Sequence, residues 1–220
     1  GERHELDDVR LLSPVIPRSK VVGVGKNYAE HAAEMGGAVP ETPLIFLKPN
    51  TSVIGPDDAI VRPEGCAELS YEGELAVVIG RICKQVPVER VPEVIFGYTI
   101  ANDVTARDWQ RSDGQWFRAK GSDTFLPLGP WINTHVTIEE AGTLSIETRL
   151  NDEVRQDGST SQMVRGIAEL ISFITASVTL LPGDVVLTGT PAGVGSMEPG
   201  DLVHVTIDGL GTLSNPVVDA

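Results

Sequence analysis

Short apolar runs separated by turn-forming residues dominate the hydropathy pattern of the chain. Runs of strand length cover residues 20–25, 44–47, 69–80, 94–101, 184–187 and 202–207, and the last of these is the last strand we expect. At 144–150, Leu144, Ile146 and Leu150 alternate with polar or charged residues. This alternation is typical of a half-buried antiparallel strand, and Asn151-Asp152 predicts the turn of a hairpin.

Helical periodicity is limited to a few places. One long helix is predicted after Ser161, because apolar residues recur at helical spacing from Val164 to Val178 before a Pro-Gly pair ends the pattern. The Ala-rich centre of 26–37 favours one or two helical turns, and a short helix is expected over 104–111. Many short strands with few helices predict a β-rich α+β fold.

Composition narrows the class of protein. The 220 residues are enough for one good core, so we expect an N-terminal arm over 1–19 and a single domain over 20–220. The 23 glycines and 15 prolines agree with many turns. The net charge of −14 disfavours nucleic acids and anionic membranes as partners. Cys66 and Cys83 have no metal-type spacing and are too few for a disulfide framework, so we expect both to be reduced. The sequence contains no apolar signal or membrane segment, so we expect a cytoplasmic protein.

The stretch 69–80 carries the first candidate chemistry. Glu72 and Glu74 open an apolar run, and the period of two places both carboxylates on one strand face. Two like charges at the mouth of a buried strand repel each other unless a cation or a proton lies between them. A divalent metal would supply such a cation, although Glu-x-Glu pairs also occur on solvated strand faces.

Other residues have both a chemical and a structural interpretation. His31 and Glu34 are three apart on the predicted helical turns, so they form either a catalytic dyad on a mobile lid or a surface pair. Asp103 follows a strand and could act in a site or cap the next helix. Lys48 at a strand end and Lys120 in a loop could face a site or solvent. Thr190, in a Gly-rich loop, could offer its hydroxyl to a substrate carboxylate or belong to a tight turn.

Taken together, these landmarks closely resemble the fumarylacetoacetate hydrolase superfamily. The motifs that carry the resemblance occur in the family's order over about residues 20 to 216 and are Val24-Gly25-Lys26-Asn27-Tyr28-Ala29-Glu30-His31, Phe46-Leu47-Lys48-Pro49, Tyr71-Glu72-Gly73-Glu74-Leu75, Asn102-Asp103-Val104-Thr105-Ala106-Arg107-Asp108, Arg118-Ala119-Lys120-Gly121 and Thr188-Gly189-Thr190-Pro191-Ala192-Gly193-Val194-Gly195.

The resemblance implies a mixed β-roll or β-sandwich domain, usually a homodimer, and it assigns roles to single residues. Mg²⁺ or Mn²⁺ would be held by Glu72, Glu74 and Asp103, whose carboxylate oxygens suit a hard octahedral cation. The implied catalytic residues are His31, Glu34 and Lys120, and the implied substrate-binding residues are Arg107, Gln110 and Thr190.

The function expected from the resemblance is metal-dependent chemistry on a 2-oxo acid or a 2-hydroxydienoate through a metal-stabilised enolate. The branch that the chain most resembles is the 2-hydroxyhepta-2,4-diene-1,7-dioate isomerase/decarboxylase of aromatic catabolism. An acylpyruvate hydrolase that cleaves a C–C bond to give pyruvate, or an oxaloacetate decarboxylase, is the alternative. A protein that binds metal and a 2-oxo acid without turnover is the alternative from another class.

Overall fold

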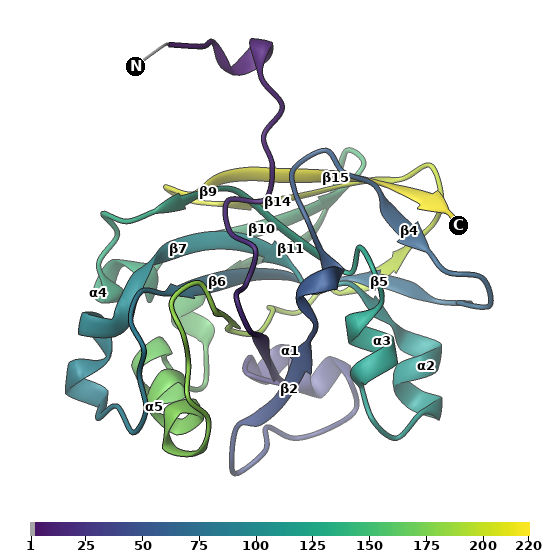
Figure 1. The fold of residues 1–220 in the computed structure, drawn as a ribbon. Coiled ribbons are helices and arrows are strands. Elements are labelled where there is room, and N and C mark those ends of the chain that lie inside the picture. Colours follow the sequence, from purple (N-terminus) through teal and green to yellow (C-terminus); the bar gives the residue numbers. More distant parts are fainter. Residues whose placement is uncertain (1–2) are drawn as a thin grey trace.

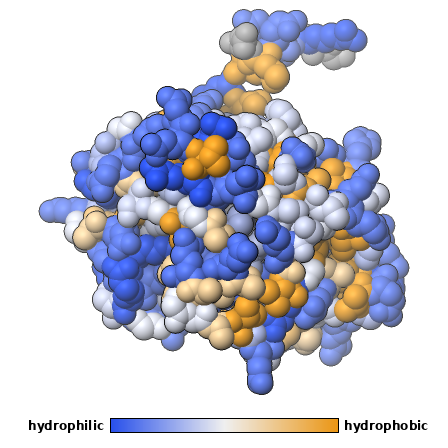
Figure 2. Space-filling view, turned by 180° about the vertical axis from the view of Figure 1, so that it is seen from behind, coloured by the Kyte–Doolittle hydropathy of each residue, from blue (hydrophilic) through white to orange (hydrophobic). Residues whose placement is uncertain are grey.

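The computed structural model describes residues 3–220 (Figure 1). Its strands form three mixed or antiparallel sheets, and its helices are few and short, so the predicted α+β fold class is confirmed. The segment around η1 (Leu6–Asp8) extends away from the body of the molecule, as both views show (Figures 1 and 2). This arm exposes apolar side chains, among them Leu6, Leu12 and Ile16.

The largest sheet places the candidate carboxylates. Its seven strands lie in the order β2 (Leu44–Lys48), β1 (Val21–Gly25), β12 (Val185–Leu187), β6 (Gly73–Ile79), β7 (Ile95–Asn102), β9 (Leu126–Asn133) and β3 (Val53–Ile54). β6 is the central strand, and every residue in it is buried. Burial on both faces explains why apolar residues follow Glu74 without alternation.

Two smaller sheets complete the β-structure. One has the order β11 (Glu153–Ser159), β10 (Ser145–Leu150), β14 (Leu202–Ile207), β15 (Gly211–Asp219) and β4 (Ile60–Arg62). The other has the order β13 (Gly195–Met197), β5 (Leu69–Tyr71) and β8 (Thr105–Ala106). β10 and β11 pair antiparallel, which confirms the predicted hairpin at Asn151.

The helical elements are mostly of one or two turns. They are η1 (Leu6–Asp8), α1 (Ala29–Glu34), η2 (Asn50–Ser52), η3 (Val88–Val94), α2 (Arg107–Ser112), α3 (Phe117–Gly121), α4 (Ile138–Ala141), η4 (Thr160–Gln162) and α5 (Ile167–Ser177). α5 packs on η3 and buries Leu170, Ile171 and Ile174, each worth about 1.5–3 kcal/mol of hydrophobic stabilisation. Within residues 3–220, no helix has the length and apolar character needed to cross a membrane.

The predicted start of the long helix was wrong. The helix begins at Ile167 after Gly166, and Val164 lies outside it with its side chain exposed. The backbone N–H of Val164 donates to the carbonyl oxygen of Asn27, and that of Arg165 donates to the Asn27 side chain. These tertiary bonds hold the backbone just ahead of Gly166, whose extended conformation makes it the N-cap at which the helix starts.

Three further local predictions need correction. The stretch 69–80 is two strands, β5 and β6, which separate at Glu72, where the backbone N–H donates to the Asn102 side chain. Lys120 lies in the helix α3 rather than in a loop. The strand over 202–207, predicted to be the last, is followed by β15. The sequence did not predict β9, because its prolines, Pro127 and Pro130, are unusual inside a strand.

Candidate metal centre and active site

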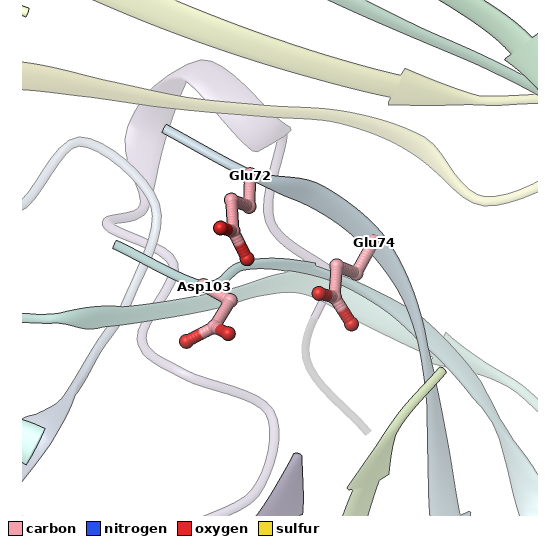
Figure 3. A group of neighbouring side chains, drawn as sticks. All are labelled: Glu72, Glu74 and Asp103. Carbon is pink, nitrogen blue, oxygen red and sulfur yellow. The ribbon is translucent and has the colours of Figure 1, made fainter. Parts of the chain in front are cut away.

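Three buried carboxylates lie close together at one end of the neighbouring strands β6 and β7 of the large sheet (Figure 3). Glu72 joins β5 to β6, Glu74 lies in β6, and Asp103 follows β7. β6 and β7 pair antiparallel, with Gly73 opposite Asn102, and the Asp103 N–H donates to the Glu72 carbonyl oxygen. One oxygen from each carboxylate lies within 4.8 Å of the other two. Asp103 therefore belongs to the acidic group, and Ala106, not Asp103, is the N-cap of α2.

Two cations face Glu72. The Lys120 Nζ donates to its Oε2 at 2.7 Å, and an Arg107 guanidinium nitrogen lies 2.5 Å from its Oε1. Burial alone would raise the pKa of the Glu72 carboxyl, but these two charges hold the pKa well below its usual range. Glu72 is therefore ionised inside the protein.

Asp103 also has two cationic partners. Lys120 donates to its Oδ2 at 2.6 Å, and Lys48 donates to its Oδ1 at 2.5 Å. Lys48 is completely buried, and burial lowers the pKa of its ammonium group although Asp103 opposes this shift. Burial also acts to lower the pKa of Lys120, but Asp103 and Glu72 raise it overall. The strand-end Lys48 thus faces the site and not solvent.

Glu74 differs from its two neighbours. Its Oε2 accepts a hydrogen bond of 2.7 Å from the Gly189 N–H, and among residues 3–220 no lysine or arginine forms an ion pair with it. Burial, together with the charges of Asp103 and Glu72, raises the pKa of the Glu74 carboxyl well above its usual value. Lys120 and the Gly189 N–H oppose this shift only in part, so Glu74 is the carboxylate of the three whose charge the protein compensates least.

The donor set fits a divalent metal. Three carboxylates supply only oxygen ligands, which Mg²⁺ and Mn²⁺ prefer, and their oxygens are close enough to share one ion. A cation bound there would also compensate the charge of Glu74. The side chains of Glu72, Glu74 and Asp103 could hold such an ion.

The predicted His31–Glu34 pair lies on α1, beside the same site. The imidazole is buried, Nδ1 lies 3.4 Å from Glu34 Oε2, and Glu34 also accepts from the Gly193 N–H in the Gly-rich loop. Burial lowers the pKa of His31 below 6.5, although the Glu72 charge opposes this. A neutral imidazole is the form that can accept a proton.

A cavity of about 200 Å³ lies in front of the carboxylates. β1, α1, α2 and α3 all contribute to it. Its charged and polar lining residues are Lys26, His31, Glu72, Glu74, Arg107, Gln110, Arg111, Lys120 and Thr190. Seven of the nine predicted site residues line this cavity. The other two, Asp103 and Glu34, contact the lining residues Lys120 and His31 directly.

The three predicted substrate-binding residues are already engaged in hydrogen bonds. Arg107 pairs with Glu72 and donates to the Gln110 side chain at 3.1 Å. The Thr190 hydroxyl donates to the Gly73 carbonyl oxygen at 2.7 Å. Thr190 therefore ties the Gly-rich loop to β6, while Arg107 and Gln110 present a linked polar surface to the cavity.

One supporting residue had no signal in the sequence. Gln156 in β11 is buried, accepts from the Gly73 N–H and donates to Thr190. The hairpin pattern suggested an ordinary polar position there. Its role depends on how the second sheet packs against the Glu-x-Glu segment, which local patterns do not show.

Comparison with known proteins agrees with this geometry. The family described as fumarylacetoacetate (FAA) hydrolase C-terminal matches residues 20–218. A structure of 5-carboxymethyl-2-hydroxymuconate delta-isomerase from Mycobacterium smegmatis is 55% identical and superimposes with a TM-score of 0.92 over 100% of this chain and 86% of that one. A structure of 2-hydroxyhepta-2,4-diene-1,7-dioate isomerase from Mycobacterium marinum is 51% identical, with a TM-score of 0.91 over 100% of this chain and 81% of that one.

A relative named for a different substrate is also similar. Oxaloacetate tautomerase YisK of Bacillus subtilis is 42% identical over 225 residues, which cover 97% of this chain and 75% of that protein. The matched family spans nearly the whole chain, including the carboxylate group and its cationic partners. The chain therefore belongs to the fumarylacetoacetate hydrolase family.

Proposed function

We propose that this protein is a divalent-metal-dependent isomerase that moves a proton at the carbon beside a 2-oxo or 2-hydroxy-enoic carboxylate group. The observation that supports it most is the joint presence, around one cavity, of three buried carboxylates and a buried imidazole. Similar proteins are a delta-isomerase, a dienedioate isomerase and an oxaloacetate tautomerase. Their named reactions share a shift of a proton and a double bond.

Glu72, Glu74 and Asp103 would hold Mg²⁺ or Mn²⁺. When bound, this ion would act as a Lewis acid toward the 2-oxo oxygen of the substrate. Lys48 and Lys120 hold the Asp103 carboxylate in position through hydrogen bonds, and Arg107 and Lys120 hold Glu72 in its ionised form.

His31 is the residue that we assign to the proton transfer. Its Nδ1 faces Glu34, so an N–H at this position donates to the carboxylate and leaves Nε2 as the proton acceptor. Burial keeps the ring neutral, and Glu34 stabilises the imidazolium that forms when the proton arrives. Glu34 is in turn held by the Gly193 N–H, so the pair is fixed to the Gly-rich loop.

Lys120 is the residue that we assign to substrate charge. Two of its three N–H donors go to Glu72 and Asp103, which leaves the third available to a substrate oxygen. Its ammonium also lies 5.1 Å from the centre of the Phe46 ring. These contacts orient the ammonium, so binding a carboxylate there costs little further ordering.

The test is a proton NMR time course in D₂O with Mg²⁺. Separate tubes contain 2-hydroxyhepta-2,4-diene-1,7-dioate, oxaloacetate and acetylpyruvate, each with protein, without protein, and with protein after EDTA. We expect protein-dependent, EDTA-sensitive deuterium entry at the carbon beside the 2-oxo group, or movement of the double bond. Since oxaloacetate enolises without an enzyme, the protein-free tube with Mg²⁺ sets its background rate.

The same tubes separate the alternatives. Release of pyruvate from acetylpyruvate would indicate a hydrolase, and loss of CO₂ from oxaloacetate would indicate a decarboxylase. If no compound changes faster than in the protein-free tube, the proposed isomerase activity is wrong. If exchange continues at full rate in EDTA, the metal is not required.

A further inference from the structure

Lys26 is a cavity-lining residue with an unusual backbone conformation. It lies between β1 and α1, and its φ of 56° falls in the left-handed region. Residues with a Cβ rarely adopt this conformation, and glycine is favoured there. A lysine at such a position is best explained by what its side chain does, because glycine would serve the backbone better.

Lys26 also differs from the other cations around the cavity. Lys120 and Arg107 are bound to the acidic residues of the candidate metal centre, and Arg111 pairs with Glu68 at 2.6 Å. Across residues 3–220, Lys26 is the one lysine or arginine lining this cavity that forms no ion pair. In a chain with a net charge of −14, an unpaired cation beside a cavity is suited to an anionic ligand.

The position of the ammonium group depends on Gly37. A Cβ added to Gly37 would lie 2.7 Å from Lys26 Nζ, so the nitrogen lies closely over this glycine, just beyond the end of α1. Lys26 therefore carries its charge to the segment that follows the His31–Glu34 helix. This location is separate from the ion-paired group formed by Lys48, Lys120 and Arg107.

From these observations we infer that Lys26 binds a second carboxylate of the substrate, so that the enzyme prefers 2-oxo dicarboxylates to 2-oxo monocarboxylates. The inference rests on the proposed function for the chemistry at the 2-oxo end of the substrate. The carboxylate beside the 2-oxo group would occupy the region of Lys120, and the distal carboxylate would meet the free ammonium of Lys26. Lys26 is then a specificity-determining residue with no part in the proton transfer.

The first experiment compares two substrates in wild-type protein and in Lys26→Met. The probes are oxaloacetate, a dicarboxylate, and 2-oxobutyrate, a monocarboxylate, with deuterium entry at C3 as the readout above the protein-free background. We expect kcat/KM for oxaloacetate to fall by about 10- to 100-fold, mostly through KM, because a charge-assisted hydrogen bond is lost. The rate with 2-oxobutyrate should stay within about twofold. Lys26→Arg should retain most of the preference for oxaloacetate.

Arg111→Met is the matched control, because it removes a cation from the same cavity wall that is already paired with Glu68. We expect its ratio of kcat/KM for the two substrates to equal that of the wild type. If Lys26→Met slows both substrates equally, Lys26 supports α1 and does not select the substrate, and the inference fails. It also fails if neither rate changes.

A binding measurement keeps the inference separate from the proposed activity. Calorimetric titration of the Mg²⁺-loaded protein with 2-oxoglutarate and with 2-oxobutyrate requires no turnover. Tighter binding of 2-oxoglutarate that Lys26→Met abolishes would support the role of Lys26 even if no isomerisation is found. Equal affinity for the two acids, or no binding of either, would overturn it.

Discussion

The side-chain nitrogen of Lys48 lies 2.5 Å from Oδ1 of Asp103, and both groups are buried. The two residues are 55 positions apart in the sequence; Lys48 ends β2, and Asp103 directly follows β7. This ion pair joins the edge strand β2 to the candidate metal centre without contacting the cavity itself. It predicts that the stability of the fold and the binding of a cation are coupled.

Lys48→Met should lower the free energy of unfolding in EDTA by about 3 kcal/mol, because the buried Asp103 carboxylate loses one of its two cationic partners. Saturating Mg²⁺ should restore part of this loss, since a bound cation supplies positive charge to Asp103. Urea denaturation with and without Mg²⁺ measures both effects.

Lys20→Met is a suitable control, because Lys20 pairs with the buried Asp184 away from the cavity. It should lose stability without recovering it in Mg²⁺ beyond the effect seen in the wild type. Equal recovery in the two variants would contradict the coupling.

Glu74→Gln should stabilise the metal-free protein and weaken metal binding. Glu74 is buried with two other carboxylates, and among residues 3–220 no basic side chain pairs with it. Removing its charge relieves repulsion worth about 1 kcal/mol, so the melting temperature in EDTA should rise by about 2–4 °C. Affinity for Mn²⁺ should fall by more than about 100-fold, since an amide replaces one of the three carboxylates proposed as ligands.

Scanning calorimetry in EDTA and Mn²⁺ titration test the two parts of this prediction. Glu147→Gln, which changes a half-exposed carboxylate in β10, should leave both quantities unchanged. Wild-type Mn²⁺ affinity in Glu74→Gln would show that Glu74 is not a ligand.

The acid limb of kcat/KM should lie below pH 6.5. Burial lowers the pKa of His31; the charges of Arg107 and Lys120 also lower it, while Glu72 and Glu34 raise it. The imidazole therefore stays neutral and able to accept a proton as the pH falls through 6.5, and activity is lost only at lower pH. A pH profile at saturating Mg²⁺, with metal occupancy checked at each pH, measures the limb.

Glu34→Gln should shift this limb to still lower pH, because it removes a group that raises the pKa of His31. An acid limb above pH 6.5 in the wild type would contradict the assignment of His31 as the base.

Glu34→Ala should lower kcat by about 100-fold while metal affinity stays unchanged. Glu34 is not among the candidate ligands, but it holds both the imidazole and the Gly193 N–H. Glu34→Gln keeps an oxygen acceptor for Gly193 and should lose less activity. Initial rates and Mg²⁺ titrations of both variants provide the comparison, and a parallel loss of metal affinity would show that Glu34 supports the metal centre instead.

Local patterns predicted several elements of this fold because they depend on neighbours in the sequence. The period of two correctly indicated β10 and the hairpin to β11. The same patterns failed where distant residues intervene. Asn27 binds the backbone ahead of α5, and the helix begins only after Gly166, later than its apolar pattern predicts. The local pattern over 211–219 also did not predict β15, which lies between β14 and β4 in its sheet.

The sequence by itself determined that Glu72 and Glu74 share one face and that His31 lies one helical turn from Glu34, because both relations follow from strand and helix periods. Only the tertiary structure decided that Asp103, Lys48 and Lys120 meet Glu72, and that Gln156 supports Gly73. These contacts join residues between 17 and 83 positions apart. They depend on the order and register of strands, which hydrophobic periodicity within one segment cannot specify.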